Sequence, residues 1–397
     1  MTQVQNVEEG VKYITRLVDL LLSAIGAWPT SVTSSMAPKI RKCIQIVLVY
    51  FIQFVVMIPS ILFIILKVKN TRTRIKLFVP HYNSLCQVCK YTIVLRRHNE
   101  IRELIDDLKD EWINGTKEDQ WIYKTRAAIG HRLMIPFMIF IYGGGSSLRA
   151  VTPFLRPKVI LPDNTTLRHL PCPGYYFFND QISPNYELIF IVQVICGFIN
   201  YTTLSGTLGL CTTLCLHMCS MLKILGNKMN ELTNLTKTDE NTVQKKIADI
   251  VEYHTKLKEY FDRSEYVTSS IYTVELTGAV SIMVIIGYSI IMEWENSNTA
   301  GIVTYFTLQI ALVIIVFTNC FISQLLIDEG NAVKNISNTL DWHQLSVKNA
   351  RSLILIIIMS NNPMKVTVAN MVQLSLVTFT DSMKATMGYF NVLRSTL

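Results

Sequence analysis

Long apolar runs, each about as long as a bilayer is thick, dominate the sequence. A hydrocarbon core of about 30 Å requires roughly 20 apolar helical residues to cross it. Three runs reach that length without any Asp, Glu, Lys or Arg: residues 43–66, 188–222 and 300–327. Four weaker stretches carry one or two charges each: residues 77–95, 133–150, 267–292 and 366–393. The pattern predicts an all-α membrane protein with seven transmembrane helices.

Composition supports this reading. Half of the 397 residues are hydrophobic and only 17% are charged, which is unlike an ordinary soluble domain. The net charge of +8 could suit a nucleic-acid partner, but in a membrane protein it more often reflects basic loops that face the cytosol. We therefore expect contact with membrane lipid and no nucleic-acid partner.

The distribution of Lys and Arg among the loops predicts the orientation. With a cytosolic N-terminus, the inner segments hold 25 basic residues and the outer segments hold 9. Residues 67–76 oppose this bias, because they place five basic residues directly after the first span, on the outside. The predicted topology, N-terminus inside and C-terminus outside, is opposite to that of a G-protein-coupled receptor.

Two segments outside the spans have distinctive patterns. In the predicted cytosolic segment 1–42, apolar residues recur at helical spacing from Val11 to Ile25, which predicts an amphipathic helix on the inner membrane surface. Residues 153–184 lie between predicted helices 3 and 4 and contain six of the twelve prolines. We expect them to form an ordered outer lid.

The helical pattern also extends past the membrane. The run 188–222 would be about 52 Å long as a helix, so it should project into the cytosol. An apolar stripe that includes His254 continues through the extension 219–268, and residues 328–365 contain a short apolar run that begins at Leu353. These segments predict a cytosolic helical bundle, followed by helix 7 in residues 366–397.

Charged residues inside spans are costly and therefore informative. Asp381 and Lys384 are three residues apart on the last span, so they share a face, where they either neutralise one another or line a water-filled lumen. Glu275 in the fifth span is expected to have a structural partner, with a role in conduction as the alternative. Cys86 and Cys89 have metal-ligand spacing but lack a second pair. We predict no metal site, no cofactor and no catalytic group.

Four local motifs occur in a fixed order along the chain. They are the N-terminal helix that ends at Gly26, Trp28 and Pro29, the inner run 247–257, the segment 342–363, and the ending 383–394 with its Tyr389-Phe390 pair. Their order and spacing together resemble the insect odorant receptor family. A gustatory receptor, the related alternative, usually has a final helix with Thr-Tyr, five apolar residues and Gln-Phe, and this chain ends differently.

The resemblance implies a function and a set of residues. It implies a subunit of an odorant-gated cation channel in the cell membrane of olfactory sensory neurons, forming a heterotetramer with the odorant co-receptor and opened by a small volatile organic ligand. Extensions of helices 4 to 7 would form a cytosolic anchor that includes His254, Trp342 and Leu353.

By position, Val392 corresponds to the outer hydrophobic gate of the family, with Ser395 one turn beyond it in the pore helix that also carries Asp381 and Lys384. The ligand pocket would lie in the outer half of the subunit, among the second to sixth helices. Its expected lining, with helix packing as the alternative role for each residue, is Tyr82, Leu85, Gly145, Leu148, Phe190, Gln193, Ile286, Tyr305 and Gln309.

Overall fold

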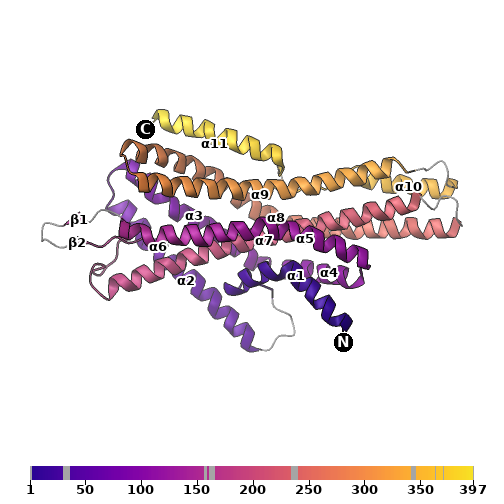
Figure 1. The fold of residues 1–397 in the computed structure, drawn as a ribbon, viewed down its shortest axis with the longest axis horizontal. Coiled ribbons are helices and arrows are strands. Elements are labelled where there is room, and N and C mark those ends of the chain that lie inside the picture. The colour runs from indigo at the N-terminus through magenta and orange to yellow at the C-terminus, as the bar shows by residue number, and fades with distance from the viewer. Residues whose placement is uncertain are drawn as a thin grey trace.

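The computed structural model describes residues 2–29, 36–155, 159–160, 166–233, 240–340, 346–362, 364–369 and 371–396. Within them, the chain forms an elongated bundle of helices (Figure 1). The helices are α1 (Thr2–Ala24), α2 (Met36–Leu66), α3 (Thr71–Arg96), α4 (His98–Asn114), α5 (Lys117–Ile139), the π-helix η1 (Phe140–Gly145), α6 (Ser146–Leu155), α7 (Asn185–Thr233), α8 (Glu240–Glu295), α9 (Thr299–Asn338), α10 (Val347–Ser360) and α11 (Leu376–Thr396).

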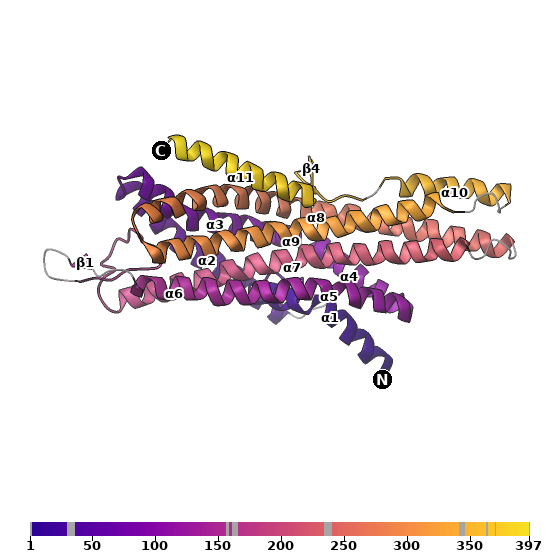
Figure 2. The same cartoon turned by 45° about the horizontal axis from the view of Figure 1, so that its top comes forward.

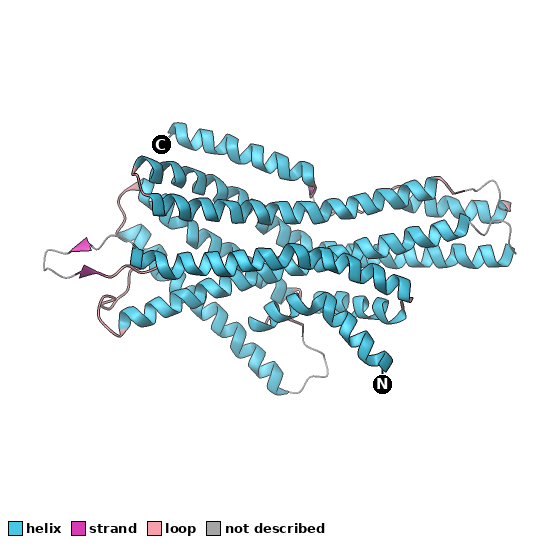
Figure 3. Ribbon diagram, in the orientation of Figure 1, coloured by secondary structure: helices cyan, strands magenta, loops and turns pink. Residues whose placement is uncertain are grey.

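The strands of the described residues form two short antiparallel hairpins (Figure 3). One consists of β1 (Val159–Ile160) and β2 (Thr166–Leu167), and the other of β3 (Thr367–Val368) and β4 (Val372–Gln373). The second hairpin occupies the place where the last span was predicted to begin. It docks on α8, where Thr367 Oγ1 donates to Glu265 at 2.6 Å and Ala369 N donates to Thr273 Oγ1 at 2.9 Å. The last helix consequently begins at Leu376, ten residues after the predicted start.

Five helical segments among the described residues are long and apolar enough to cross a membrane. They are α2, the continuous segment Lys117–Val151, α7, α8 and α9. The other two predicted spans coincide with α3 and α11, which form as helices but carry more charged and polar residues. Hydropathy alone thus finds five of the seven predicted spans, because α3 and α11 carry charged residues such as Lys90, Asp381 and Lys384.

The three longest helices run side by side along the molecule (Figures 1 and 2). α7 has 49 residues, α8 has 56 and α9 has 40. At 1.5 Å per residue, α8 would extend about 84 Å, far more than a bilayer core. α10 packs against α8 and α9 at one end of the bundle and contains the short apolar run predicted at Leu353. We call the half of the molecule at this end the inner half, and the half near the β1–β2 hairpin the outer half.

α1 packs against α7, α5 and α4. Its apolar residues Ile14, Val18 and Leu22 are buried in the main core. The helix ends at Ala24 and is followed by a turn at Gly26, which has a φ of +70°, and the N–H groups of Ala27 and Trp28 both donate to the carbonyl of Leu22. The apolar face that was expected to rest on the membrane is therefore covered by protein, because α7 and α5 offer it a complementary apolar surface.

Candidate functional site

Three of the predicted pocket residues meet in the outer half. Tyr82 of α3 and Tyr305 of α9 pack against a small buried cluster that contains Ile286 of α8. Gln309 follows Tyr305 by one helical turn, and its Oε1 is buried without a hydrogen-bond partner among the described residues. Apolar and aromatic side chains with one available acceptor are the usual composition of a small-molecule site.

Gly145 and Leu148 approach the same region from η1 and α6. Gly145 ends the π-helix, and a Cβ at its position would lie 2.9 Å from the ring of Tyr201 on α7. Only glycine allows that contact. Leu148 is half-buried in the turn that follows. Leu312 of α9 packs against the cluster that includes Tyr201 and also against the cluster around Ile286. The two clusters therefore meet on α9.

The other three predicted pocket residues lie elsewhere. Leu85 is exposed on α3. Phe190 of α7 packs against Phe154 and Tyr186, with ring centroids 5.5 and 6.1 Å apart. Gln193 is fully buried, but its amide binds the outer segment. Cys172 N donates to Gln193 Oε1 at 2.9 Å, while Gln193 Nε2 donates to Cys172 O at 2.7 Å and to Tyr176 Oη at 3.1 Å. Gln193 therefore holds part of the predicted lid in place.

The sequence did not predict which polar side chains of the outer half would form hydrogen bonds with one another. Gln53 of α2 donates to Asn200 of α7 at 2.7 Å, and Asn200 donates to Ser84 of α3 at 3.0 Å. Arg149 of α6, a charge within a predicted span, is partly buried and its Nη2 donates to Cys172 Sγ at 3.7 Å. Only the charge of Arg149 was a signal in the sequence, because Gln, Asn and Ser are tolerated at many positions in membrane helices.

Glu275 has the structural partner that was expected. It forms an ion pair with Lys90 of α3, and the side chains are 11% and 1% exposed, respectively. Each of these residues was visible in the sequence as a charge inside a span. Their pairing depends on α3 lying along α8, which the sequence did not reveal.

α11 lies along the outside of the bundle, beside α8 and α9 (Figures 1 and 2). One face packs inward: Phe379 meets Phe317 with ring centroids 5.6 Å apart, and Phe390 lies against Gly287. The other face is exposed and contains all four predicted pore residues: Val392, Ser395, Asp381 and Lys384. Asp381 Oδ1 and Lys384 Nζ are 3.7 Å apart, so the predicted pair forms, but on the surface of the single chain.

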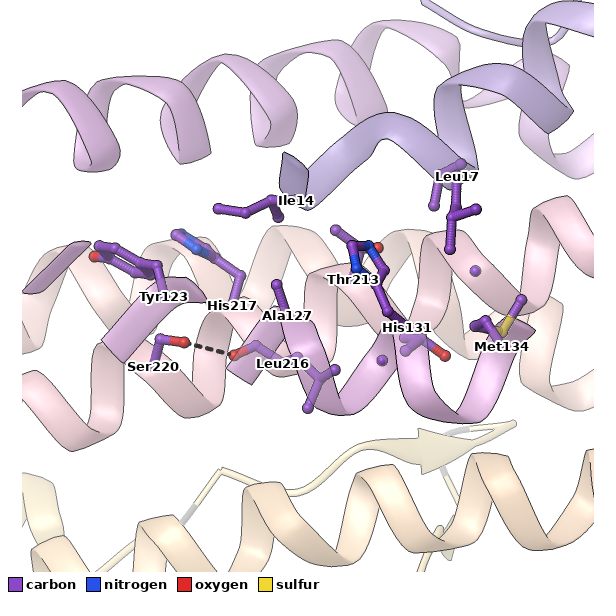
Figure 4. Close-up of a pocket in the computed structure, with 14 residues that line it drawn as sticks. Ile14, Leu17, Tyr123, Ala127, His131, Met134, Thr213, Leu216, His217 and Ser220 are labelled. Carbon is purple, nitrogen blue, oxygen red and sulfur yellow. Dashed lines mark hydrogen bonds between the residues drawn. The ribbon is translucent and has the colours of Figure 1, made fainter. Parts of the chain in front are cut away.

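A small cavity lies between α1, α5 and α7 in the inner half (Figure 4). Ile14 and Leu17 lie over it, and three polar atoms around it have no hydrogen-bond partner among the described residues: His131 Nε2, Thr212 Oγ1 and His217 Nε2. Its volume of about 30 Å³ is enough for about two water molecules. The cavity is therefore suited to buried water, not to an odorant.

Of the predicted anchor residues, His254 and Leu353 are buried in the inner half, whereas Trp342 lies outside the described residues. His254 lies on the predicted stripe of α8, beside the fully buried Leu257. Burial, and after it the charge of Lys258, lower the pKa of His254 to about 4. The imidazole is thus neutral at physiological pH.

The helices define a multi-pass membrane protein, and comparison with known proteins gives its family. A family model described as 7tm odorant receptor matches residues 70–387, so the chain belongs to this family. Members of the family are receptors and not enzymes. The resemblance inferred from the short motifs is confirmed.

Curated relatives in Drosophila melanogaster are similar over part of their length. Odorant receptor 30a is 21% identical over 218 residues, which are 53% of this chain and 55% of the relative. Odorant receptor 82a is 25% identical over 195 residues, 49% of each chain. The chain thus spans about half the length of the curated relatives it matches.

Solved structures show the same fold. The insect olfactory receptor OR5 from Machilis hrabei in complex with eugenol has a TM-score of 0.80 at 15% identity, covering 97% of this chain and 98% of that one. The same receptor described without eugenol gives a TM-score of 0.79 at 16% identity, covering 96% and 97%. The predicted all-α membrane fold is confirmed.

Proposed function

We propose that the chain is a subunit of an odorant-gated, non-selective cation channel that acts with the odorant co-receptor in the cell membrane of olfactory sensory neurons. The observation that carries the proposal is the position of α11. This helix is packed on one face only, while the stripe with Asp381, Lys384 and Val392 is uncovered in the single chain. A helix that completes a pore with neighbouring subunits needs such a face.

The odorant site we propose is the outer-half region between α3, α8, α9 and η1. Tyr82, Ile286 and Tyr305 supply apolar and aromatic contact, and Gln309 supplies the polar group that would orient a small volatile molecule. Gly145 and Leu148 would close the side formed by η1 and α6. Leu85, Phe190 and Gln193 lie outside this cluster. They would affect odorant binding only indirectly, through the outer surface of the same half. The binding of eugenol by the Machilis hrabei receptor supports a small organic ligand.

Gating would couple this site to α11. The site and α11 share the same neighbours, because α8 and α9 contribute residues to the cluster and also contact α11. An odorant that binds the open arrangement more tightly shifts the population toward it and retracts Val392 from the pore. A ring of such apolar side chains blocks ions by dewetting, and Ser395 would line the wider exit.

The inner half would serve as the anchor between subunits, with a cytosolic N-terminus. Residues 219–268 and 328–365 would form it, with His254, Trp342 and Leu353 among its members. The tight packing of Leu257, Leu326 and Leu353 supports a rigid role for this half.

Whole-cell recording tests the proposal. Cells would express the chain with or without an insect odorant co-receptor while a broad panel of volatiles is applied. We expect a fast cation current that requires both subunits and persists when G-protein signalling is blocked. A response that needs no co-receptor and disappears on G-protein block would refute the channel assignment.

The gate is tested separately by Val392→Ala. Shortening this side chain widens and wets the constriction, so ligand-free current should rise. Val303→Ala on α9, also an exposed valine, is the matched control and should leave the leak unchanged. An unchanged leak in Val392→Ala would remove Val392 from the gate.

A further inference from the structure

A hollow in the outer half lies away from the proposed odorant site. It is a groove of about 600 Å³ between α2, α7 and the residues 172–178, which we call the strap. Its floor and walls are aliphatic and aromatic, with Phe51, Phe54, Val55 and Ile58 from α2 and Leu188 and Val192 from α7. Several of these side chains are also exposed on the surface of the chain. The groove therefore opens toward the surface that a bilayer would cover.

The strap is held over the groove from both sides. Tyr175 N donates to Pro59 O on α2 at 2.8 Å, and the amide of Gln193 on α7 binds both Cys172 and Tyr176. These hydrogen bonds hold the strap in place, so that its aromatic side chains form one wall of the groove. The groove is thus a built feature of the fold and not a gap between loosely placed helices.

A cation lies at one end of the groove. Lys67 directly follows α2, and its Nζ is 5.5 Å from the ring centroid of Tyr175, which lines the groove. Lys67 belongs to the basic segment 67–76 that opposes the positive-inside bias. Within that segment Lys76 is paired with Glu293 at 2.6 Å, and Arg74 Nε donates to Val68 O at 2.6 Å. Lys67 instead lies beside the aromatic ring of Tyr175 at the end of the first apolar helix, and aromatic and basic residues are typical of the headgroup level of a bilayer.

The lining favours a hydrocarbon chain over an odorant. Small-molecule sites usually combine apolar walls with a few polar groups that orient the ligand. Gln193 is the amide in this lining, and it is already engaged by Cys172 and Tyr176. An acyl chain needs no orienting group and can make van der Waals contacts along the apolar walls, while its phosphate can meet Lys67.

We propose that this groove binds one acyl chain of a glycerophospholipid from the outer leaflet, with the lipid phosphate on Lys67. The assignment to the outer leaflet depends on the orientation in the proposed function, whereas the binding itself does not. A bound chain fills the space under the strap and stabilises the outer face. The basic segment 67–76 would then have a role outside the cell. The positive-inside rule alone does not explain five basic residues on that side.

Photo-crosslinking tests the proposal. The full-length chain would be expressed in membranes that contain a phosphatidylcholine with a diazirine in one acyl chain, and the labelled peptides would be mapped. We expect labelling concentrated in residues 51–62, 175–178 and 188–193. Even labelling along all lipid-facing helices would overturn the proposal. So would competition by an odorant that opens the channel, because the groove would then be an odorant site.

Two pairs of variants make the test specific. Val55→Trp fills the groove and should lower its labelling several-fold, because the indole ring occupies the space in which the acyl chain would lie. Val47→Trp places the same bulk on an exposed part of α2 outside the groove and should leave the labelling unchanged. Ile58→Trp repeats the test if Val55→Trp does not fold. Unchanged labelling in a folded groove variant would contradict the proposal.

The second pair addresses the phosphate. Lys67→Gln should lower labelling by the phosphatidylcholine probe about threefold, as expected for a solvent-screened ion pair. Lys69→Gln removes a charge from the same segment and should have no effect. Equal effects of the two substitutions would assign the loss to general surface charge. None of these readouts requires a current, so failure of the channel assignment and failure of the lipid site are distinguishable.

Discussion

The inner and outer halves of the chain are packed differently. In the inner half, buried side chains from α4, α5, α7, α8, α9 and α10 form one continuous core that includes Trp112, Leu257 and Leu353. In the outer half, the buried apolar residues form three small clusters, and polar side chains such as Gln193 and Asn200 are buried in the same half. A continuous core resists deformation, whereas small clusters between polar groups allow helices to shift. Under the proposed function, the inner half would be the rigid support and the outer half the region that responds to a ligand.

The largest effect should come from breaking the buried ion pair between α3 and α8. Lys90→Met leaves Glu275 buried without its partner and should cost about 3–5 kcal/mol in stability. Replacing both residues, Lys90→Met with Glu275→Leu, should recover most of that loss because no buried charge remains. Lys384→Met, at the exposed pair with Asp381, should cost less than about 1 kcal/mol. The apparent Tm of the purified chain measures all three, and equal losses at the two pairs would contradict the difference in burial.

The continuity of the inner core is tested at α10. Leu353→Ala removes a fully buried side chain and should cost about 2–5 kcal/mol through lost contact and the cavity that remains. The neighbouring Ile354→Ala alters an exposed position and should change stability by less than about 0.5 kcal/mol. The same thermal measurement applies. A small effect of Leu353→Ala would show that α10 is not part of the rigid half.

The adaptability of the outer half is tested at Ile286, in the proposed odorant site. Ile286→Val enlarges the site by one methyl group and should shift the potency of an activating odorant about tenfold, with larger homologues favoured. Ile310→Val makes the same change at an exposed position of α9 and should leave potency unaltered. Concentration–response curves in cells that also express the co-receptor provide the measurement. Identical shifts in the two variants would exclude Ile286 from the site.

The smallest effect concerns pH and the neutral His254 of the inner half. Its folded-state pKa of about 4 is below the unfolded value of 6.5, so the unfolded chain binds the proton more readily between these values. Stability is therefore complete above about pH 6.5 and falls as the pH drops toward 4. Between pH 7 and 5.5 the loss should be about 1 kcal/mol, and His254→Gln should reduce it. Apparent Tm values at both pH values measure it, and an equal pH dependence in both proteins would exclude His254 as the cause.

The sequence predicted the long apolar helices well, whereas the residues of the candidate site stay a prediction. Tyr82, Ile286 and Tyr305 lie in one cluster, Leu85 is exposed and Gln193 binds the strap. Which face of a nearly uniform apolar helix turns inward is not encoded in its hydropathy, since lipid and protein neighbours are both apolar. The residues of such a site are consequently harder to predict than its helices.

The sequence by itself determined the membrane class, the helices, the extension of α7 to α9 beyond a bilayer and the family, because these depend on the local period and length of apolar runs and on short ordered motifs. Only the tertiary structure decided that Lys90 pairs with Glu275, that α1 packs on protein, that residues 367–373 form a hairpin and that the strap closes a groove against α2 and α7. Each of these depends on contacts between residues far apart in the chain. Such contacts are set by which surfaces complement one another once the helices have formed.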